Sequence, residues 1–237
     1  MLLDEQSEFA GTNYIVGVRT IDGSPPVKLG DGDIGRYSPD GKWVSAVING
    51  QSRHFTLLPT GAGEPKDVTV DGLEFLQLVD FLPGGQLLLT GAEHGHGFRC
   101  YTRLMAGGPL KAITREGIGR CRPSPDSRRV VGEEATGALW LSDLDGQGQP
   151  IPNTENMVPI RWADSRSILT FRKGEMPARV FQIDVASGKQ KVVRMLAPTD
   201  RAGVSQIQTV AGSPDGHTFA YSYQQVLYDL YVVEELR

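Results

Sequence analysis

The sequence lacks long apolar runs, a secretion signal and a strong charge of either sign. No stretch of about 18 apolar residues occurs in its 237 residues, so no transmembrane helix is predicted. The first six residues lack the basic and apolar regions of a signal peptide. The 24 lysines and arginines are balanced by 28 aspartates and glutamates, and the net charge of −4 argues against a nucleic-acid partner or a general anionic-membrane surface. These absences favour a soluble chain, and this sequence taken by itself predicts a cytoplasmic location.

The motifs of several catalytic classes are also missing. There is no Gly-x-Ser-x-Gly nucleophile elbow, and neither the His-Arg-Asp nor the Asp-Phe-Gly motif of kinases occurs. Residues 30–35 match Gly-x-Gly-x-x-Gly formally, but Ser38-Pro39-Asp40 follows too closely to leave room for the helix that a phosphate site needs. We therefore interpret residues 30–35 as a glycine-rich link between strands. We expect no cofactor and predict that the chain is not an enzyme.

What the sequence does contain is a turn motif that occurs five times. The copies are Ser-Pro-Asp-Gly-Lys (38–42), Pro-Gly-Gly-Gln (83–86), Ser-Pro-Asp-Ser-Arg (124–128), Ala-Asp-Ser-Arg (163–166) and Ser-Pro-Asp-Gly-His (213–217). Counted from Asp40, Gly84, Asp126, Asp164 and Asp215, the spacings are 44, 42, 38 and 51 residues. A period of this length, with several short strands in each unit, is the signature of a β-propeller.

Each unit predicts a four-stranded antiparallel blade, because short β-rich runs alternate with glycine-containing turns. The expected repeats are 34–70, 75–114, 119–151, 158–195 and 207–237, preceded by a partial blade over 1–30. Their first strands are expected at 34–38, 75–82, 119–124, 158–162 and 207–213, and the third strand of the last unit at 226–233. The sequence therefore predicts one all-β domain over residues 1–237, with an inserted loop around 197–205.

Two closed arrangements remain open, namely six blades with three-stranded ends, or five blades with a strand exchanged between the ends. A third alternative places missing blades in a longer polypeptide, because an open array would leave edge strands unpaired. The chain would then associate, covalently or not, with further propeller blades.

The repeats resemble those of the TolB β-propeller family, whose hallmark is Ser-Pro-Asp-Gly-Lys before a β-rich strand. Residues 14–42, 58–65, 220–223 and 229–234 are similar, more narrowly, to the C-terminal propeller region of acidobacterial-type bacterial serine/threonine kinases. In those proteins a cytoplasmic kinase and a membrane span precede a propeller that is taken to be a sensor or interaction domain. The resemblance implies such a module here, extracytoplasmic if the chain is part of a membrane-anchored kinase. The turns at 83–86 and 163–166 depart from the hallmark.

The candidate binding residues lie on the predicted innermost strands, just before the turns. They are Arg36, Asp80, Arg120, Arg122 and Arg161. Four arginines and one aspartate, converging on a central channel, would form a cationic site for a small anionic ligand or an acidic peptide. The alternative is that some of these arginines pair locally with Glu133, Glu134 or Asp164.

Two further sets of polar residues could form catalytic or metal sites. Asp40, Asp126, Asp164 and Asp215 are predicted to hold their own hairpins through Asx-turn hydrogen bonds, because they lie on separate blades. His94 and His96 are the best metal-like pair, but a zinc site needs further ligands, and we expect an ordinary polar loop instead. No metal is therefore predicted.

Cys100 and Cys121 are expected in strands of adjacent repeats. A disulfide would require their α-carbons to lie within about 7 Å. Unpaired cysteines usually behave as small buried hydrophobic residues. We expect two free, partly buried thiols.

Three classes of function follow from these observations. The first is a non-catalytic binding or sensor module with a protein partner or a small anionic ligand. The second is an enzyme that uses the channel, as lyase- or lactonase-like propellers do, or the non-catalytic propeller of a prolyl-oligopeptidase-type hydrolase. The third is a structural fragment that folds only with its missing blades. The lack of clustered metal ligands on the inner strands favours the first.

Overall fold

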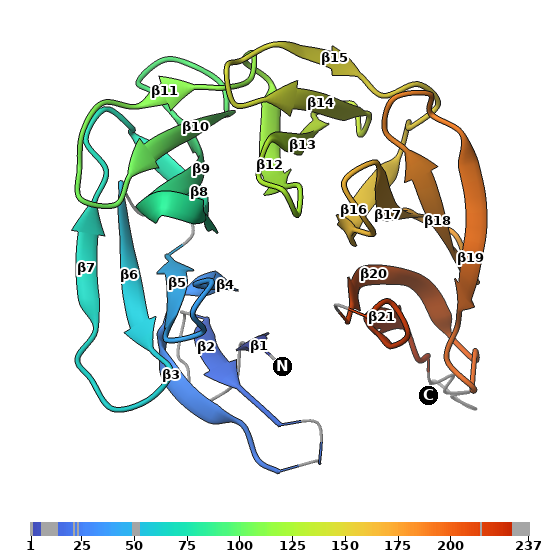
Figure 1. Ribbon diagram of the computed structural model, residues 1–237. Helices are drawn as coiled ribbons and strands as arrows, with labels where there is room; N and C mark the ends of the chain where they lie inside the picture. Colours follow the sequence, from blue (N-terminus) through green and yellow to red (C-terminus); the bar gives the residue numbers. More distant parts are fainter. Residues whose placement is uncertain are drawn as a thin grey trace, which may run out of the picture. The chain divides into compact units, whose positions relative to one another are not determined.

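The structure is a computed structural model, and it describes residues 2–5, 14–20, 22, 24–48, 53–213 and 215–228 (Figure 1). These residues form β-strands and one short 3-10 helix, η1 (Pro83–Gly85). The chain divides into two compact units, Met1–Ile151 (unit 1) and Pro152–Arg237 (unit 2). No helix among the described residues has the length and apolar character needed to cross a membrane.

The described part of unit 1 forms four antiparallel sheets. The first consists of β1 (Leu2–Glu5), β2 (Ile15–Val18) and β3 (Val27–Asp31). The second consists of β4 (Asp33–Tyr37), β5 (Trp43–Val47), β6 (His54–Pro59) and β7 (Lys66–Thr69). The third consists of β8 (Phe75–Leu82), β9 (Gln86–Ala92), β10 (Arg99–Leu104) and β11 (Lys111–Ala112). The fourth consists of β12 (Ile118–Pro123), β13 (Arg129–Glu134), β14 (Leu139–Asp143) and β15 (Gly148–Pro150). In every sheet, consecutive strands are neighbours.

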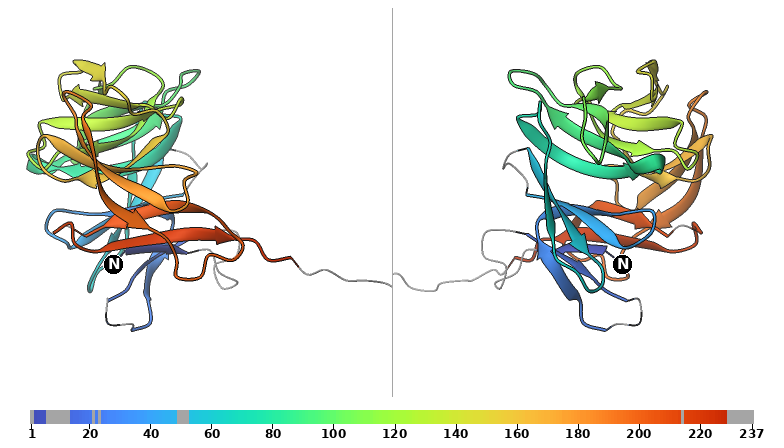
Figure 2. Two further views of the ribbon diagram at one scale, coloured as in Figure 1. Left: turned by 90° about the vertical axis from the view of Figure 1, so that its right-hand side faces the viewer. Right: turned by 60° about the vertical axis from the view of Figure 1, so that its left-hand side comes forward.

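The described part of unit 2 contains two sheets. One consists of β16 (Met157–Trp162), β17 (Ser167–Arg172), β18 (Ala178–Asp184) and β19 (Gln190–Leu196). The other pairs β20 (Val204–Gly212) with β21 (Phe219–Gln225). Each sheet is strongly twisted, as the two views of Figure 2 show.

These strands confirm the predicted all-β class and the four-stranded antiparallel units. The partial blade predicted over 1–30 corresponds to β1, β2 and β3. The strand predicted at 226–233 is wrong for residues 226–228, which lie outside any strand, and residues 229–237 fall outside the described part of the chain. The number of blades, the closure of the ring and the single domain stay predictions.

The core of unit 1 lies between successive sheets, because alternate residues of each strand face opposite sides. Leu57 of β6 belongs to one buried cluster with Val79 and Leu89 of the next sheet. Leu58, its neighbour in the chain, packs instead in a cluster with Val16 of the preceding sheet. The sheet of β4–β7 is therefore apolar on both faces.

In unit 2, the sheet of β16–β19 packs against the β20–β21 pair. Phe171, Val180 and Ile207 are buried in one cluster, and Phe219 and Tyr221 of β21 pack on it. Packing of this kind stabilises the β20–β21 pair, because an isolated two-stranded hairpin is marginally stable in water.

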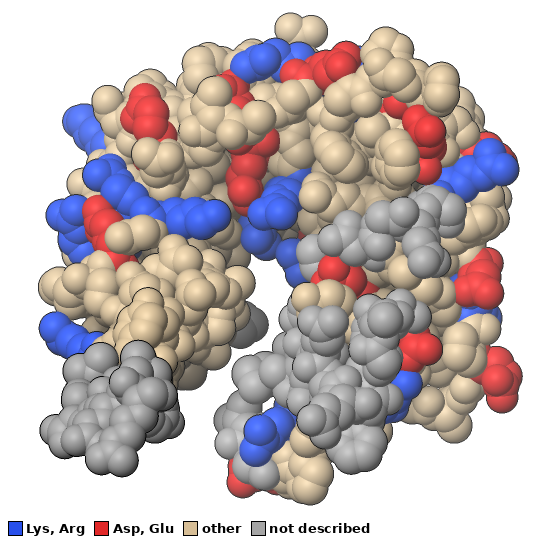
Figure 3. Space-filling model, turned by 180° about the vertical axis from the view of Figure 1, so that it is seen from behind, with Lys and Arg blue, Asp and Glu red and all other residues tan. Residues whose placement is uncertain are grey.

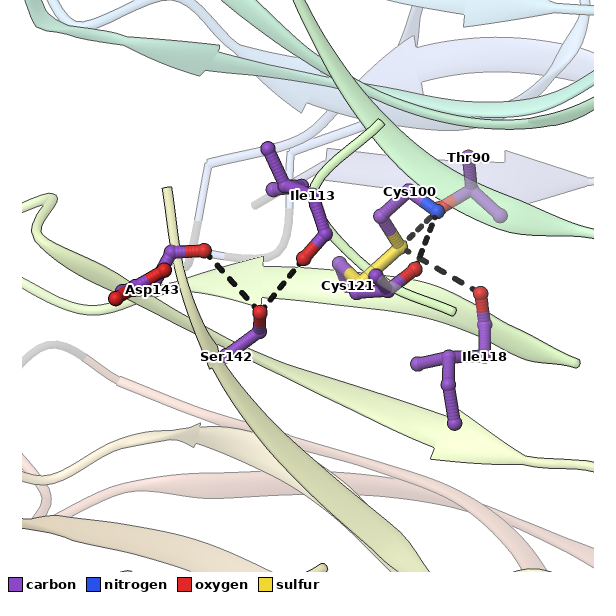
Figure 4. Close-up of a disulfide and its surroundings, with 8 residues drawn as sticks. Thr90, Cys100, Ile113, Ile118, Cys121, Ser142 and Asp143 are labelled. Atoms are coloured by element: carbon purple, nitrogen blue, oxygen red, sulfur yellow. Dashed lines mark hydrogen bonds between the residues drawn. A yellow bond between two sulfur atoms is a disulfide. The ribbon is translucent and has the colours of Figure 1, made fainter. Parts of the chain in front are cut away.

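Cys100 and Cys121 form a disulfide, so the prediction of two free thiols is wrong (Figure 4). Cys100 lies in β10 and Cys121 in β12 of the next sheet, and their α-carbons are 6.2 Å apart, within disulfide range. Both residues are fully buried. The bond therefore joins two neighbouring sheets of unit 1 through their shared apolar core.

A bulge in β12 explains how the second cysteine reaches the first. Gly119 pairs with Glu133 and Arg122 with Val131, so two residues of β12, Arg120 and Cys121, lie opposite the single residue Gly132. A bulge of this kind breaks the regular alternation of side chains along a strand. It places the sulfur of Cys121 against β10. Sequence periodicity contains no signal for it.

Candidate functional site

The first strand of each four-stranded sheet has a register irregularity before its C-terminal end. These irregularities occur between Asp33 and Arg36, Leu76 and Leu78, Gly119 and Arg122, and Pro159 and Arg161. Four of the predicted site residues follow these irregularities. They occupy equivalent positions in the pairing of the first strand with the second, in which Arg36 is opposite Ser45, Asp80 opposite Leu88, Arg122 opposite Val131 and Arg161 opposite Leu169. The repeated bulge thus sets the position of these side chains.

Unit 1 brings three of the predicted residues together. Nε of Arg36 lies 3.7 Å from Oδ2 of Asp80, and the two side chains are 29% and 18% exposed. The other carboxylate oxygen of Asp80, Oδ1, accepts a hydrogen bond of 2.8 Å from the backbone N–H of Phe81. Arg122 is close enough to both Arg36 and Asp80 to affect their electrostatics. We call Arg36, Asp80 and Arg122 the inner cluster.

Burial dominates the titration of the inner cluster. It raises the pKa of Asp80 above its ordinary value, and the positive charges of Arg36 and Arg122 and the hydrogen bond from Phe81 only partly oppose this. Burial also lowers the pKa of Arg122 to about 10, and repulsion from Arg36 adds to the effect. Electrostatic interactions between charges that are removed from water in this way are stronger than those between exposed charges.

Arg120 lies beside the cluster, not within it. It has a φ of 50°, in the left-handed region that few residues other than glycine adopt, as part of the bulge in β12. Its side chain is 57% exposed, and its Nη1 lies 4.0 Å from Oε2 of Glu133. Arg120 therefore forms the local ion pair that was the alternative to channel binding.

Arg161 belongs to unit 2. Its Nη1 donates a hydrogen bond of 2.8 Å to the carbonyl of Trp162, and its guanidinium lies against Gly212 and Gly216 at the ends of the β20–β21 turn. Its positive charge contributes to the lowered pKa of Asp215, after the larger effects of the Ser213 hydroxyl and the backbone N–H of His217. Within unit 2, Arg161 thus supports a neighbouring turn.

The aspartates of the repeated turn bond to their own hairpins. Oδ1 of Asp126 accepts hydrogen bonds from the Ser124 hydroxyl at 2.6 Å and the Arg128 N–H at 3.2 Å. Asp40 has the equivalent bonds, at 2.6 and 3.1 Å. Asp164 and Asp215 also accept from side-chain hydroxyls and backbone N–H groups of their own turns. Their lone pairs are engaged locally, which suits a structural role.

His94 and His96 each face one carboxylate. Nδ1 of His94 lies 3.1 Å from Oε2 of Glu74, and Nδ1 of His96 lies 3.3 Å from Oε2 of Glu116. The described residues contain no group of three or more His, Cys, Asp or Glu side chains able to hold a metal ion. These pairs hold the loop between β9 and β10 against the segments that precede β8 and β12.

Sequence reasoning missed a polar pocket in unit 2, which Gln182, Lys189 and Lys191 help to line. A signal for it existed in the repeats, because a lysine recurs near the start of the fourth strand at Lys66, Lys111 and Lys191. The charged residues on the surface drawn in Figure 3 are of both signs and interspersed, so charge alone singles out no part of it.

No protein-family model matches the sequence, and no curated protein matches it. Solved structures do. TolB from Acinetobacter baumannii is 17% identical with a TM-score of 0.63, over 89% of this chain and 60% of that one. A putative TolB from Agrobacterium tumefaciens is 14% identical with a TM-score of 0.63, over 86% of this chain and 76% of that one. An oligogalacturonate lyase in complex with manganese is 12% identical with a TM-score of 0.60, over 86% and 62%.

These likenesses define the class of protein as an all-β protein with a propeller fold. More particularly, the fold is TolB-like, which confirms the fold that the repeated turn predicted. The chain spans 60% of the length of the Acinetobacter protein. At these identities the comparisons establish the fold alone.

Proposed function

We propose that the chain is a non-catalytic binding module and that the inner cluster recognises an anionic group, either a carboxylate of a protein partner or a small anion. The observation that carries the proposal is the ion pair of Arg36 with the largely buried Asp80, with a second arginine, Arg122, close enough to influence both. With Arg120 and Glu133 included, the region contains three guanidinium groups and two carboxylates. An incoming anion would balance the remaining positive charge.

Guanidinium groups suit this task because their N–H donors match the two oxygens of a carboxylate. Partial burial strengthens the attraction relative to that of an exposed arginine. Asp80 has a second role in the proposal, since it lowers the positive potential and fixes the direction of Arg36. Removing the Asp80 charge should therefore strengthen anion binding, whereas removing the Arg36 charge should weaken it.

Isothermal titration of the chain with citrate and with an acetylated, amidated tri-glutamate peptide tests the proposal. We expect Arg36→Gln to weaken binding by about tenfold, which corresponds to about 1.4 kcal/mol, and Asp80→Asn to strengthen it. Lys28→Gln is the matched control, because Lys28 pairs with Asp31 on β3 and is 53% exposed. Absence of binding by both probes, or an unchanged affinity in Arg36→Gln, would overturn the proposal.

We further propose that the module acts as a sensor attached to a serine/threonine kinase, as the sequence resemblance implies. The buried disulfide supports an extracytoplasmic location, because such bonds persist in oxidising compartments. Sequencing the coding region upstream of Met1 tests the kinase link, and the expected result is a kinase domain followed by an apolar span. Thiol alkylation during denaturing lysis of the cells tests the compartment, because buried cysteines react only once the chain is unfolded. Labelling of both cysteines would contradict an extracytoplasmic location.

A further inference from the structure

Unit 2 contains a polar surface pocket of about 380 Å³ on one face of its four-stranded sheet. The pocket lies over β17, β18 and β19, coloured yellow to orange in Figure 1. Gln182 of β18 pairs in register with Lys191 of β19, and Asp184 pairs with Ser167 of β17. Because alternate residues of a strand share a face, the lining residues converge from all three strands.

The two carboxylates that line the pocket are engaged by their own turns. Asp164 accepts hydrogen bonds from the backbone N–H groups of Arg166 and Ser167, at 2.7 and 2.8 Å. Oδ1 of Asp184 accepts from the backbone and the hydroxyl of Ser187, and its Oδ2 lies 3.9 Å from Nη2 of Arg166. The Ser167 hydroxyl, and next the N–H groups of its turn, lower the pKa of Asp164, and the Ser187 hydroxyl and N–H lower that of Asp184, so both carboxylates are charged and already hydrogen-bonded.

The two lysines that line the pocket are not neutralised in this way. Neither Lys189 nor Lys191 forms a salt bridge with a carboxylate among the described residues of unit 2. The floor of the pocket is polar, since Nε2 of Gln182 donates to the buried hydroxyl of Ser167 at 2.8 Å. A hydrogen-bond acceptor that enters the pocket would therefore find the ammonium groups of the two lysines and the amide of Gln182, which is already hydrogen-bonded.

One repeat of unit 1 shows an acidic partner for such a lysine, whereas in another repeat Lys66 lies 4.5 Å from the centroid of the Trp43 ring. Lys111 is the equivalent of Lys191, because Lys111 pairs in register with Thr102 as Lys191 does with Gln182. Nζ of Lys111 lies 2.7 Å from Oδ1 of Asp145, which belongs to the turn between β14 and β15 of the next sheet. The hydrogen bond from Lys111, and next its positive charge, lower the pKa of Asp145.

In the described part of unit 2, the sheet after β19 consists of β20 and β21 alone. Strands equivalent to β14 and β15, and the acidic turn between them, are not among the described residues. We propose that the pocket of Lys189 and Lys191 binds the carboxylate of an acidic β-turn from a polypeptide, as Lys111 binds Asp145. This site lies in unit 2 and rests on no part of the function proposed for the inner cluster.

The probe is a fluorescent peptide with the sequence of residues 139–150 of this chain, which contains the Asp145 turn. Its binding to the full chain is measured by anisotropy. We expect the Lys189→Met/Lys191→Met variant to bind it about two- to thirtyfold more weakly, the range for two exposed ion pairs. Lys173→Met is the control, because it removes an exposed charge from the hairpin between β17 and β18. Lys191→Arg should retain binding.

Three results would overturn the proposal. One is equal binding by an Asp145→Asn version of the peptide. Another is unchanged binding by the double lysine variant. The third is succinate binding as tightly as the peptide, which would identify a site for small dicarboxylates and not for a polypeptide turn. Both lysines are exposed, so the variant is expected to keep the thermal unfolding midpoint of the parent chain.

Discussion

Gly132 lies directly opposite Cys121 at the bulge of β12, and the disulfide occupies the space where a side chain on Gly132 would project. A β-carbon added to Gly132 would lie 2.9 Å from Sγ of Cys121 and 2.5 Å from Cγ2 of Ile118. Real β-carbons do not approach other atoms so closely. The bulge, the glycine and the disulfide therefore form one packing unit between two sheets.

Gly132→Ala tests this relationship. We expect the substitution to lower the free energy of unfolding by about 1–3 kcal/mol, the usual cost of overpacking a well-filled core. Chemical denaturation gives the value. Gly61→Ala is the control, since an added β-carbon at Gly61 meets no atom within 4 Å. An unchanged denaturation midpoint in Gly132→Ala would mean that the two sheets move apart at the disulfide, at little cost, to admit the added methyl group.

The disulfide itself should stabilise unit 1. It closes a loop with a sequence separation of 21 residues, for which the chain-entropy relation gives about 3 kcal/mol. We expect Cys100→Ala/Cys121→Ala to lose stability of this order, measured by denaturation without reductant. The parent chain should show no free thiol towards a thiol reagent, whether folded or unfolded without reductant, because both sulfur atoms are in the disulfide. Two reactive thiols in the unfolded, unreduced chain would contradict the disulfide.

The repeated turn could be predicted from sequence because its bonds are local. Ser124 and Asp126 are two residues apart, so their hydrogen bond depends only on the turn that contains them. The same reasoning applies to Ser38 and Asp40. Three of the five turns have this Ser–Asp bond, and the spacing of all five, with β-rich runs between them, was enough to predict the propeller fold that the solved structures confirm.

The candidate site was harder to predict because it depends on a bulge. Arg120 and Arg122 were both predicted as site residues because they lie on an innermost strand just before its turn. In a regular strand, two residues at this spacing would share a face. The bulge breaks that alternation, so Arg120 is 57% exposed and pairs with Glu133, whereas Arg122 is affected by Arg36 and Asp80. The disulfide was missed for the same physical reason.

Two serines with the same bonds but different burial test how much the turn contributes. The Ser124 hydroxyl donates to Asp126 and accepts from the Arg129 N–H at 3.0 Å, and Ser124 is only 2% exposed. Ser124→Ala should cost about 1–3 kcal/mol, because it leaves the partly buried Arg129 N–H without this acceptor. Ser213 accepts the Thr218 N–H at 2.9 Å in a more exposed turn. Ser213→Ala should therefore cost less, and equal costs would contradict this account.

Acid should destabilise the chain through the same turns. The Ser124 hydroxyl, and next the Arg128 N–H, lower the pKa of Asp126 below its ordinary value, so the unfolded chain binds a proton more readily than the folded one. The stabilisation is present above about pH 4, the unfolded pKa, and is lost as the pH falls through the folded pKa. Denaturant unfolding from pH 7 towards pH 3 measures the loss. Asp126→Asn should reduce it.

Asp80 provides a control of opposite sign. Burial raises its pKa, so between the unfolded and folded pKa values the folded chain binds more protons, and this group alone gains stability as the pH falls. Asp80→Asn removes that gain, and the variant should lose stability in acid more steeply than the parent chain. Asp126→Asn should show the shallower dependence. If the two variants shift the acid dependence in the same direction, one of the two assigned environments, the exposed turn or the buried cluster, is wrong.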